Sequence, residues 1–257
     1  MELASLIWFF DLDNTLHDAS HRVFPAINAN MNAFISGVLR DAGLPDDSAA
    51  VDAARVGYLR RYGATLLGMV RHHQVRPADF LHAAHLFDDL PGMLRTEPGL
   101  RALLTALPGR KVLLTNAPQR YARDVVRHFR LQRQFFQHIA IESMHVHGRL
   151  QPKPSRALLR KLLARQGVPA HRCILVEDTL ANLKSAKALG MRTVWMTGYL
   201  GASRATAGRT PHPAGGAGTA PPPASVAAKT TKRPAYVDVK VKSIRQLFDS
   251  LPSLLGK

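Results

Sequence analysis

Two aspartates, Asp11 and Asp13, stand two residues apart directly after the short apolar run LIWFF. An apolar run that turns abruptly acidic is typical of a buried parallel strand that delivers side chains to its carboxyl end. At such an end, one carboxylate and a neighbouring carbonyl can face the same cation while the second carboxylate points toward a substrate. The pair therefore suggests phosphoryl chemistry, although a turn with two solvated aspartates has the same pattern.

Two further signals concern the binding of phosphate. Thr115 ends the run KVLLT and Asn116 follows it, so a hydroxyl and exposed backbone N–H groups could hold phosphate oxygens there. A helix cap is the alternative interpretation of these two residues. Lys153 lies in the loop QPKPS, just before a helical pattern, where its ammonium could neutralise both a phosphate and a nucleophile. Alone, a loop lysine is usually solvated.

A second acidic pair, Glu177 and Asp178, ends the run CILVE. Carboxylate oxygens at this position could complete a site for a hard cation. All four signals end or follow an expected strand, and the carboxyl ends of parallel strands share one edge of a sheet. We therefore expect them to converge on one rim.

The sequence predicts an α/β fold as the framework that positions these residues. Short apolar runs alternate with helical patterns, which indicates a parallel sheet flanked by helices. Strands are expected at 6–10, 111–115, 139–142, 173–177 and 193–196, and crossover helices at 155–166 and 180–189. Cys173 is the only cysteine, so we interpret it as a buried strand residue.

A helical insertion interrupts this alternation, because apolar residues recur at helical spacing after the first strand. We assign residues 24–94 to it, and residues 1–23 and 95–257 to the α/β core. Composition shifts to Gly, Ala, Pro, Ser and Thr from about 198 to 234, so we expect a disordered insertion at 201–233. After it, VDVKV predicts an edge strand, and a final helix follows.

Composition narrows the function classes. The chain has 257 residues, no apolar run long enough to span a bilayer and no signal-like N-terminus, so we expect a cytoplasmic protein without a membrane partner. Its net charge of +17 would suit nucleic acid, but the basic residues are dispersed and match no nucleic-acid-binding motif. Specific nucleic-acid binding is therefore not expected. A positive field would also attract phosphorylated substrates.

The segments FDLDNTL, LLTNAP, KP and VEDTLANLKSAKALGMRTVWM resemble, in order, the four motifs of the haloacid dehalogenase superfamily. The resemblance covers nearly the whole chain outside the compositionally biased stretch. It implies a Rossmann-like core with an inserted, mobile helical cap. It also implies a Mg²⁺-dependent phosphatase that acts through an aspartyl-phosphate intermediate.

Residue by residue, the resemblance implies that Asp11 is the nucleophile and Asp13 the general acid and base. Thr115, Asn116 and Lys153 then bind phosphate. Asp11, the Asp13 carbonyl and Asp178 hold Mg²⁺. Asn182 stands where many relatives carry a second acid, so Glu177 and Asn182 are expected to support the ion's ligands or Lys153 rather than bind the ion.

Asp13 favours a phosphatase over a dehalogenase, because the dehalogenase branch lacks this second acid. A phosphomutase shares the four motifs and is an alternative, but nothing in the helical insertion specifically resembles one. The runs DLDNTLHDASHRVFPAINANM, YLRRYGATLLGMVRHH and TNAPQRYA resemble the pyrimidine 5′-nucleotidase branch. This implies a small phosphomonoester as the partner, preferably UMP or CMP. The alternatives are a phosphatase for sugar phosphates or phosphoglycolate, and a nucleic-acid-binding protein on the same fold.

Three side chains outside the motifs are candidates for substrate contact. His17 and His21 lie between the nucleophile and the insertion, and Tyr62 lies within the insertion. The histidines could instead cap a helix, and Tyr62 could pack in the helical core.

Overall fold

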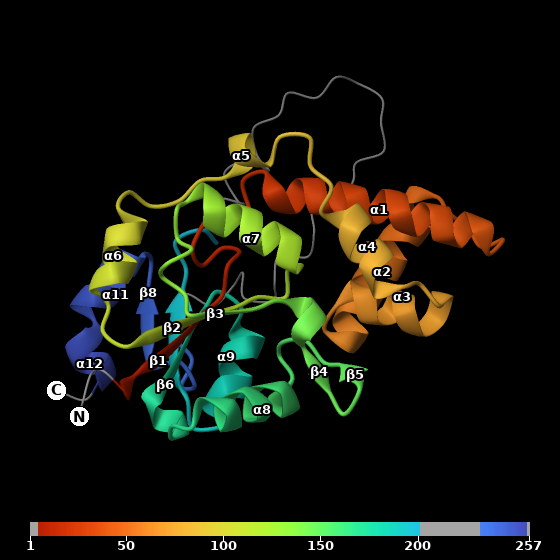
Figure 1. The fold of residues 1–257 in the computed structure, drawn as a ribbon. Coiled ribbons are helices and arrows are strands. Elements are labelled where there is room, and N and C mark those ends of the chain that lie inside the picture. Colours follow the sequence, from red (N-terminus) through yellow and green to blue (C-terminus); the bar gives the residue numbers. More distant parts are fainter. Residues whose placement is uncertain (1–4, 201–231, 256–257) are drawn as a thin grey trace. The chain divides into compact units, whose positions relative to one another are not determined.

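The computed structural model describes residues 5–200 and 232–255, and a six-stranded parallel sheet in the order β3-β2-β1-β6-β7-β8 forms the core of its α/β part (Figure 1). The strands are β1 (Ile7–Phe10), β2 (Arg110–Leu114), β3 (Gln137–Ile139), β6 (Cys173–Glu177), β7 (Arg192–Met196) and β8 (Val239–Val241). The expected α/β class and Rossmann-like parallel sheet are confirmed. Strand order reverses direction at β1, and ligands of such sheets bind in the crevice at this switch point.

Strand β1 is buried on both faces, as its uninterrupted apolar run predicts. Its last residue, Phe10, pairs with Leu113 of β2 on one side and with Val176 of β6 on the other. The backbone N–H of Asp11 donates to the Val176 carbonyl at 3.0 Å and so continues the ladder by one residue. This register brings Asp11 level with the carboxyl ends of both neighbouring strands.

Helices α8 (Arg156–Gln166) and α9 (Leu180–Lys187) pack on one face of the sheet. Leu158, Leu162 and Leu183 from these helices join Phe9 and Leu175 from the strands in one buried cluster. The other α-helices that the structure describes in the α/β part are α6 (Leu100–Ala106), α7 (Gln119–His128), α11 (Ile244–Asp249) and α12 (Leu251–Leu255). The predicted crossover helices, the edge strand at VDVKV and the final helical region are therefore present.

The chain forms two compact units: residues 5–20, 94–200 and 232–255 make the α/β unit, and residues 21–93 make a helical unit. The helical unit contains α1 (Val23–Asp41), α2 (Ser48–Tyr62), α3 (Thr65–His73), α4 (Pro77–Ala84) and α5 (Leu90–Met93). The predicted disordered insertion covers residues 201–233. Of these, residues 201–231 lie outside the described residues.

Helix α2 is joined to α1 by the side chain of Arg55, which is buried. Its guanidinium donates from Nε to Asn32 Oδ1 at 2.8 Å and from Nη2 to Asp52 Oδ1 at 2.9 Å. Asn32 also donates to Asp52 Oδ1 at 3.1 Å, which closes the network. Because a buried charge is tolerated only when paired and hydrogen-bonded, this network fixes how the two helices pack.

Two glycines in the segment 58–73 are explained by the local backbone and packing. Gly63 ends α2 in the left-handed region with φ 81°, where a side chain is strained. Gly68 lies against Tyr58, and a Cβ built at Gly68 would stand 2.1 Å from Tyr58 Cγ. The close packing of α2 on α3 therefore requires glycine at position 68.

The strand predicted at 139–142 is displaced. Strand β3 covers Gln137–Ile139, and Ile141–Ser143 forms a 3-10 helix, η2. Ile139 pairs with Leu114, the last residue of β2, so beyond that point β3 has no neighbouring backbone to pair with. The Ile141 N–H instead donates to the Ala117 carbonyl at 3.2 Å.

The sequence analysis also missed the short hairpin formed by β4 (His145–Val146) and β5 (Arg149–Leu150). Its two-residue turn has positive φ at both His147 and Gly148, as tight hairpin turns require. Cys173 is a fully buried residue of β6, as predicted, and burial raises the pKa of its thiol to about 11. Among the described residues, no helix is both long and apolar enough to span a bilayer.

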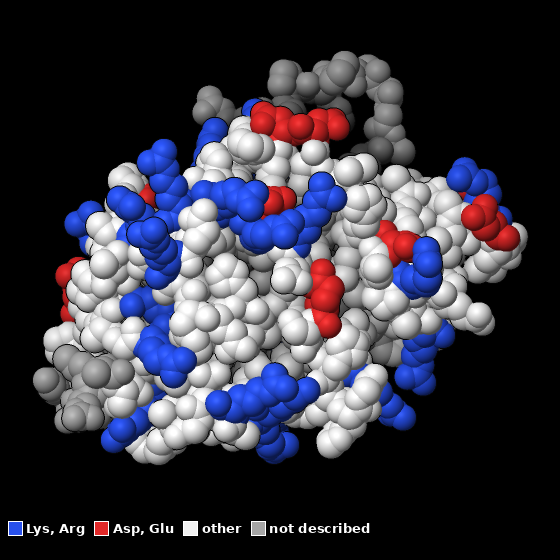
Figure 2. All heavy atoms as spheres, in the orientation of Figure 1, with Lys and Arg blue, Asp and Glu red and all other residues white. Residues whose placement is uncertain are grey.

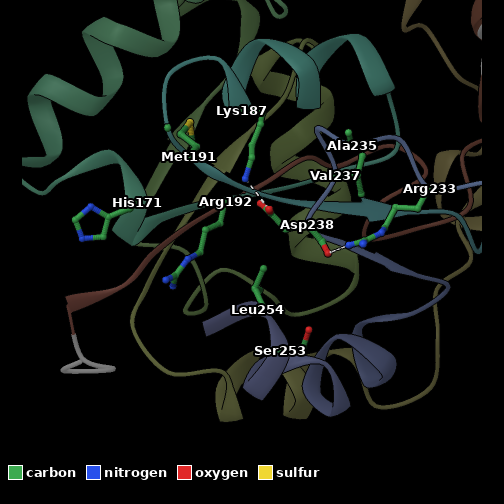
Figure 3. Close-up of a pocket in the computed structure, with 11 residues that line it drawn as sticks. His171, Lys187, Met191, Arg192, Arg233, Ala235, Val237, Asp238, Ser253 and Leu254 are labelled. Carbon is green, nitrogen blue, oxygen red and sulfur yellow. Dashed lines mark hydrogen bonds and ion pairs between the residues drawn. The ribbon is translucent and has the colours of Figure 1, made fainter. Parts of the chain in front are cut away.

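A cavity of about 390 Å³ lies beside Arg192, at the amino end of β7 and hence at the opposite edge of the sheet from Asp11 (Figure 3). Lys187 Nζ donates to Asp238 Oδ1 at 2.6 Å, and the Thr193 N–H donates to Asp238 Oδ2 at 2.9 Å. Burial raises the pKa of Asp238, but these bonds outweigh burial and hold it below its usual range. The interactions of this cavity's charged groups thus tie β8 to β7 and α9.

Gly68→Ala is expected to destabilise the protein by about 1–3 kcal/mol, because the new methyl overlaps Cβ and Cγ of Tyr58, atoms close to the backbone. Gly57→Ala in α2 is the matched control: a Cβ there meets no atom within 4 Å, so helix propensity should stabilise by about 0.5–1 kcal/mol. Denaturant unfolding followed by circular dichroism measures both. Equal stabilisation by the two alanines would contradict the packing role of Gly68.

Candidate active site

A buried lysine between two carboxylates forms the centre of the candidate site. Lys153 Nζ lies 2.7 Å from Asp11 Oδ1 and 2.7 Å from Glu177 Oε2, and all three side chains are buried. Asp11 follows β1 and Glu177 ends β6, so the parallel register of these two strands sets the separation of the carboxylates. Both distances are those of charge-assisted hydrogen bonds.

The backbone of Lys153 is held by the side chain of Asn116. Its Nδ2 donates to the Lys153 carbonyl at 2.9 Å, and its Oδ1 accepts from the Lys153 N–H at 3.0 Å. These paired bonds tie the loop before α8 to the end of β2. The side-chain amide of Asn116 thus has two backbone partners in the Lys153 loop. The binding of phosphate by Asn116 stays a prediction.

Thr115 is buried directly beyond β2, where its N–H donates to the Ile139 carbonyl at 3.0 Å. The Thr115 hydroxyl accepts from the Ala117 N–H at 3.1 Å, which bends the chain after the strand. The structure therefore gives Thr115 a local turn role, and its binding of phosphate remains a prediction.

Negative charge exceeds positive charge in the centre of the site. Asp11, Glu177 and Asp178 each offer a carboxylate oxygen within 4.8 Å of the others, and Lys153 is the ammonium bonded to the first two. Burial and then Glu177 raise the pKa of Asp11 to about 8, although Lys153 lowers it. Burial, Glu177 and Asp11 likewise raise the pKa of Asp178 well above its usual range.

The partners of Glu177 separate its role from that of the two aspartates. Glu177 Oε2 accepts from both Lys153 Nζ and Asn182 Nδ2, the latter at 2.9 Å, and Oε1 accepts from the Thr179 N–H at 3.1 Å. Burial raises the pKa of Glu177, but the ammonium and these hydrogen bonds outweigh burial and hold it below its usual range. Glu177 therefore supports Lys153, and Asp11 and Asp178 are left as the acids best suited to face a cation.

Asp13 lies on the same loop as Asp11 but has different partners. The Tyr121 hydroxyl donates to Asp13 Oδ1 at 2.6 Å, and His17 Nε2 lies 2.9 Å from the same oxygen. Tyr121 is buried in α7, and burial followed by the charge of Asp13 raises its pKa well above the usual range, so the phenol keeps its proton. The sequence analysis missed Tyr121 as a site residue, although the quoted run TNAPQRYA contains it.

The three predicted substrate contacts occupy different surroundings. His17 is fully buried against Asp13, and His21 is half-buried at the start of the helical unit. The Tyr62 hydroxyl lies 2.6 Å from His72 Nε2, with the Arg61 guanidinium 5.5 Å from its ring centroid. Tyr62 thus has partners within its own unit. Contact of these residues with substrate stays a prediction.

Residues 7–190 match the haloacid dehalogenase-like hydrolase family, and the chain belongs to that family.

Figure 2 shows Lys and Arg side chains spread over the visible face, with acidic side chains between them, as the dispersed charge of the sequence predicts.

Solved structures of the same fold include a HAD phosphatase from Thermococcus onnurineus, with 15% identity and a TM-score of 0.58 over 96% of this chain and 98% of that one. CbbY from Rhodobacter sphaeroides, in complex with phosphate, has 17% identity and a TM-score of 0.55 over 94% and 95%. L-2-haloacid dehalogenase from Xanthobacter autotrophicus has 15% identity and a TM-score of 0.51 over 95% and 97%. At these identities the similarity concerns the fold and leaves the reaction to be argued from the site.

Lys153→Met is expected to lower the free energy of unfolding by on the order of 3 kcal/mol, because it leaves the buried Asp11 and Glu177 carboxylates without their shared cation. Lys184→Met, at an exposed position of α9, removes the same charge and should change stability little. Urea unfolding in a buffer free of divalent cations compares them. A Lys153→Met protein as stable as the control would show that the ion pairs do not hold the site together.

Proposed function

We propose that the protein is a Mg²⁺-dependent phosphomonoesterase that uses Asp11 as nucleophile and Asp13 as general acid and base. The observation that carries the proposal is the buried cluster in which Lys153 is bonded to both Asp11 and Glu177, with Asp178 beside them and Asp13 two residues after Asp11. The motif resemblance gives the same residues the same roles.

The proposed reaction has two balanced halves. The Asp11 carboxylate forms a bond to phosphorus as the ester P–O bond breaks, and the ester oxygen takes a proton from Asp13 and leaves as the alcohol. Water then gives a proton to Asp13 and attacks phosphorus, which releases inorganic phosphate and restores the Asp11 carboxylate. Lys153 reduces the repulsion between carboxylate and phosphate in both halves.

The residues of the site fit a divalent cation. Three buried carboxylates offer oxygens within 4.8 Å of one another, and Lys153 is bonded to two of them; hard cations prefer oxygen ligands of this kind. We assign Asp11, the Asp13 carbonyl and Asp178 to Mg²⁺, because the motif resemblance gives them this role and Glu177 accepts three hydrogen bonds, from Lys153, Asn182 and Thr179. When bound, the ion supplies positive charge that stabilises the transferring phosphoryl oxygens.

Two other functions explain the site less well. Dehalogenation does not use a second acid, whereas here Tyr121 and His17 hold Asp13 in place. A nucleic-acid-binding protein that had lost catalysis would not need to keep Asp11, Lys153 and Glu177 buried together, because a buried ion-pair cluster is costly to maintain.

The proposed substrates are nucleoside 5′-monophosphates, with pyrimidines preferred over purines. The resemblance of YLRRYGATLLGMVRHH and TNAPQRYA to the pyrimidine 5′-nucleotidase branch supports this preference. We further propose that residues 24–94 act as the cap that selects the substrate, because the core chemistry is indifferent to the alcohol that leaves.

Wild-type protein should release nitrophenolate from p-nitrophenyl phosphate with Mg²⁺ and lose this activity with EDTA. Asp11→Asn should lower turnover by at least about 10³-fold, because the amide keeps the volume but cannot form the covalent intermediate. Asp124→Asn on the surface of α7 is the matched control and should retain activity.

Circular dichroism and thermal unfolding should show that the fold of Asp11→Asn is retained. Absence of phosphatase activity in the wild type would refute the proposed function. Wild-type-like turnover by Asp11→Asn would refute only the nucleophile assignment.

UMP and CMP should give higher kcat/KM values than AMP, GMP, glucose 6-phosphate and phosphoglycolate when phosphate release is measured with Mg²⁺. Desolvated contacts to a base can discriminate by about ten- to hundred-fold. If phosphoglycolate or the sugar phosphate led by more than about tenfold on the same scale, the nucleotidase preference would be wrong and the general phosphatase proposal would remain.

A further inference from the structure

Two hydrogen-bonding groups converge on a single oxygen of Asp13. The Tyr121 hydroxyl lies 2.6 Å and His17 Nε2 lies 2.9 Å from Asp13 Oδ1, and the two groups are 3.3 Å from each other. All three residues belong to the α/β unit. Asp13 and His17 lie on the loop after β1, whereas Tyr121 comes from α7, more than a hundred residues further along the chain.

We propose that Tyr121 and His17 are positioning residues that orient the Asp13 carboxylate for proton transfer, an inference that rests on the phosphomonoesterase function proposed above. General acid catalysis requires the acid to stand within hydrogen-bond reach of the leaving oxygen. A carboxylate on a loop rotates about two single bonds, and two fixed hydrogen bonds to one oxygen stop that rotation.

The surroundings of Tyr121 make it a rigid donor. Tyr121 is 3% exposed, and the neighbouring residues Ala122, Val125 and Val126 bury the same helix against the core. Its hydroxyl donates to Asp13 Oδ1 at 2.6 Å. Tyr121 therefore holds the acid in one orientation.

The other ring nitrogen of His17 supports the same interpretation. His17 is fully buried, and its Nδ1 has no hydrogen-bond partner among the described residues. The ring is packed with its centroid 6.0 Å from that of Phe129. A buried polar atom without a partner is costly, and an apolar residue would avoid that cost. The contact of Nε2 with Asp13 Oδ1 at 2.9 Å gives a reason for histidine here.

A purely structural role for the network predicts a different pattern of kinetics. If Tyr121 only stabilised the fold, its hydroxyl would affect every substrate alike. If it positions the acid, its loss matters most when the leaving group needs a proton. Nitrophenolate leaves as a stable anion, whereas the alkoxide of UMP must be protonated as the P–O bond breaks.

The test compares kcat/KM of wild type and Tyr121→Phe on p-nitrophenyl phosphate and UMP with Mg²⁺. The expected result is a loss of about tenfold or more on UMP and less than about threefold on the aryl ester. If wild-type turnover of UMP is too slow to measure, glycerol 1-phosphate replaces it. Tyr199→Phe is the matched control: its hydroxyl accepts from the Glu97 N–H at 3.2 Å, and its loss should affect neither ester selectively.

The double mutant with Asp13→Asn separates positioning from folding further. Tyr121→Phe should add little to the loss caused by Asp13→Asn, because two residues that act as a unit are not additive. Equal losses on both esters, or fully additive losses in the double mutant, would overturn the inference while leaving the phosphatase proposal intact. If Tyr121→Phe does not fold, His17→Asn, which removes Nε2, must show the same dependence on the ester. No release of phosphate by wild type would refute the underlying function instead.

Discussion

The ammonium of Lys153, buried between Asp11 and Glu177, is the interaction on which the rest of the site depends. Removing the ammonium would leave two carboxylates in the interior without their shared cation, which is far more costly than the net value of the ion pairs. The structure therefore holds all three from separate directions. The register of β1 with β6 sets the acids, and the paired amide bonds of Asn116 set the lysine loop.

This arrangement leaves the site with more negative charge than its own residues neutralise. Burial, and after it the charge of the neighbouring carboxylates, raises the pKa values of Asp11 and Asp178. Carboxylates with perturbed pKa values at the carboxyl ends of strands are typical of functional sites. Under the proposed function, a bound Mg²⁺ would neutralise the excess negative charge and so allow an anionic phosphoryl group to approach Asp11.

Tyr121 and His17 are bonded to Asp13, whereas Lys153 is bonded to Asp11, two residues earlier. One loop thus presents two carboxylates in different environments. Nucleophile and proton-transfer group need different electrostatics, and such separation of environments is how one site can use two acids for two tasks. In the helical unit, Gly63 is explained by the left-handed backbone at the end of α2, and Gly68 by its close contact with Tyr58.

The sequence by itself determined the α/β class and which acids and which lysine form the candidate site. Continuous apolar runs ending in Asp11, Thr115 and Glu177 define buried parallel strands, and local residue order alone fixes which side chains follow each strand. The length of β3 was not readable in this way, because it is limited by where its partner β2 ends rather than by its own residues.

Only the tertiary structure decided which of these side chains pair. Hydrogen bonds between Asn116 and Lys153, between Glu177 and Lys153, and between Tyr121 and Asp13 join segments 24 to 108 residues apart. Contacts of this kind leave no periodicity in the sequence, because their geometry arises when distant loops meet at one edge of the sheet. For that reason the sequence indicated the acids and the lysine, while the roles of Asn116, His17 and Tyr121 as their supports came from the fold.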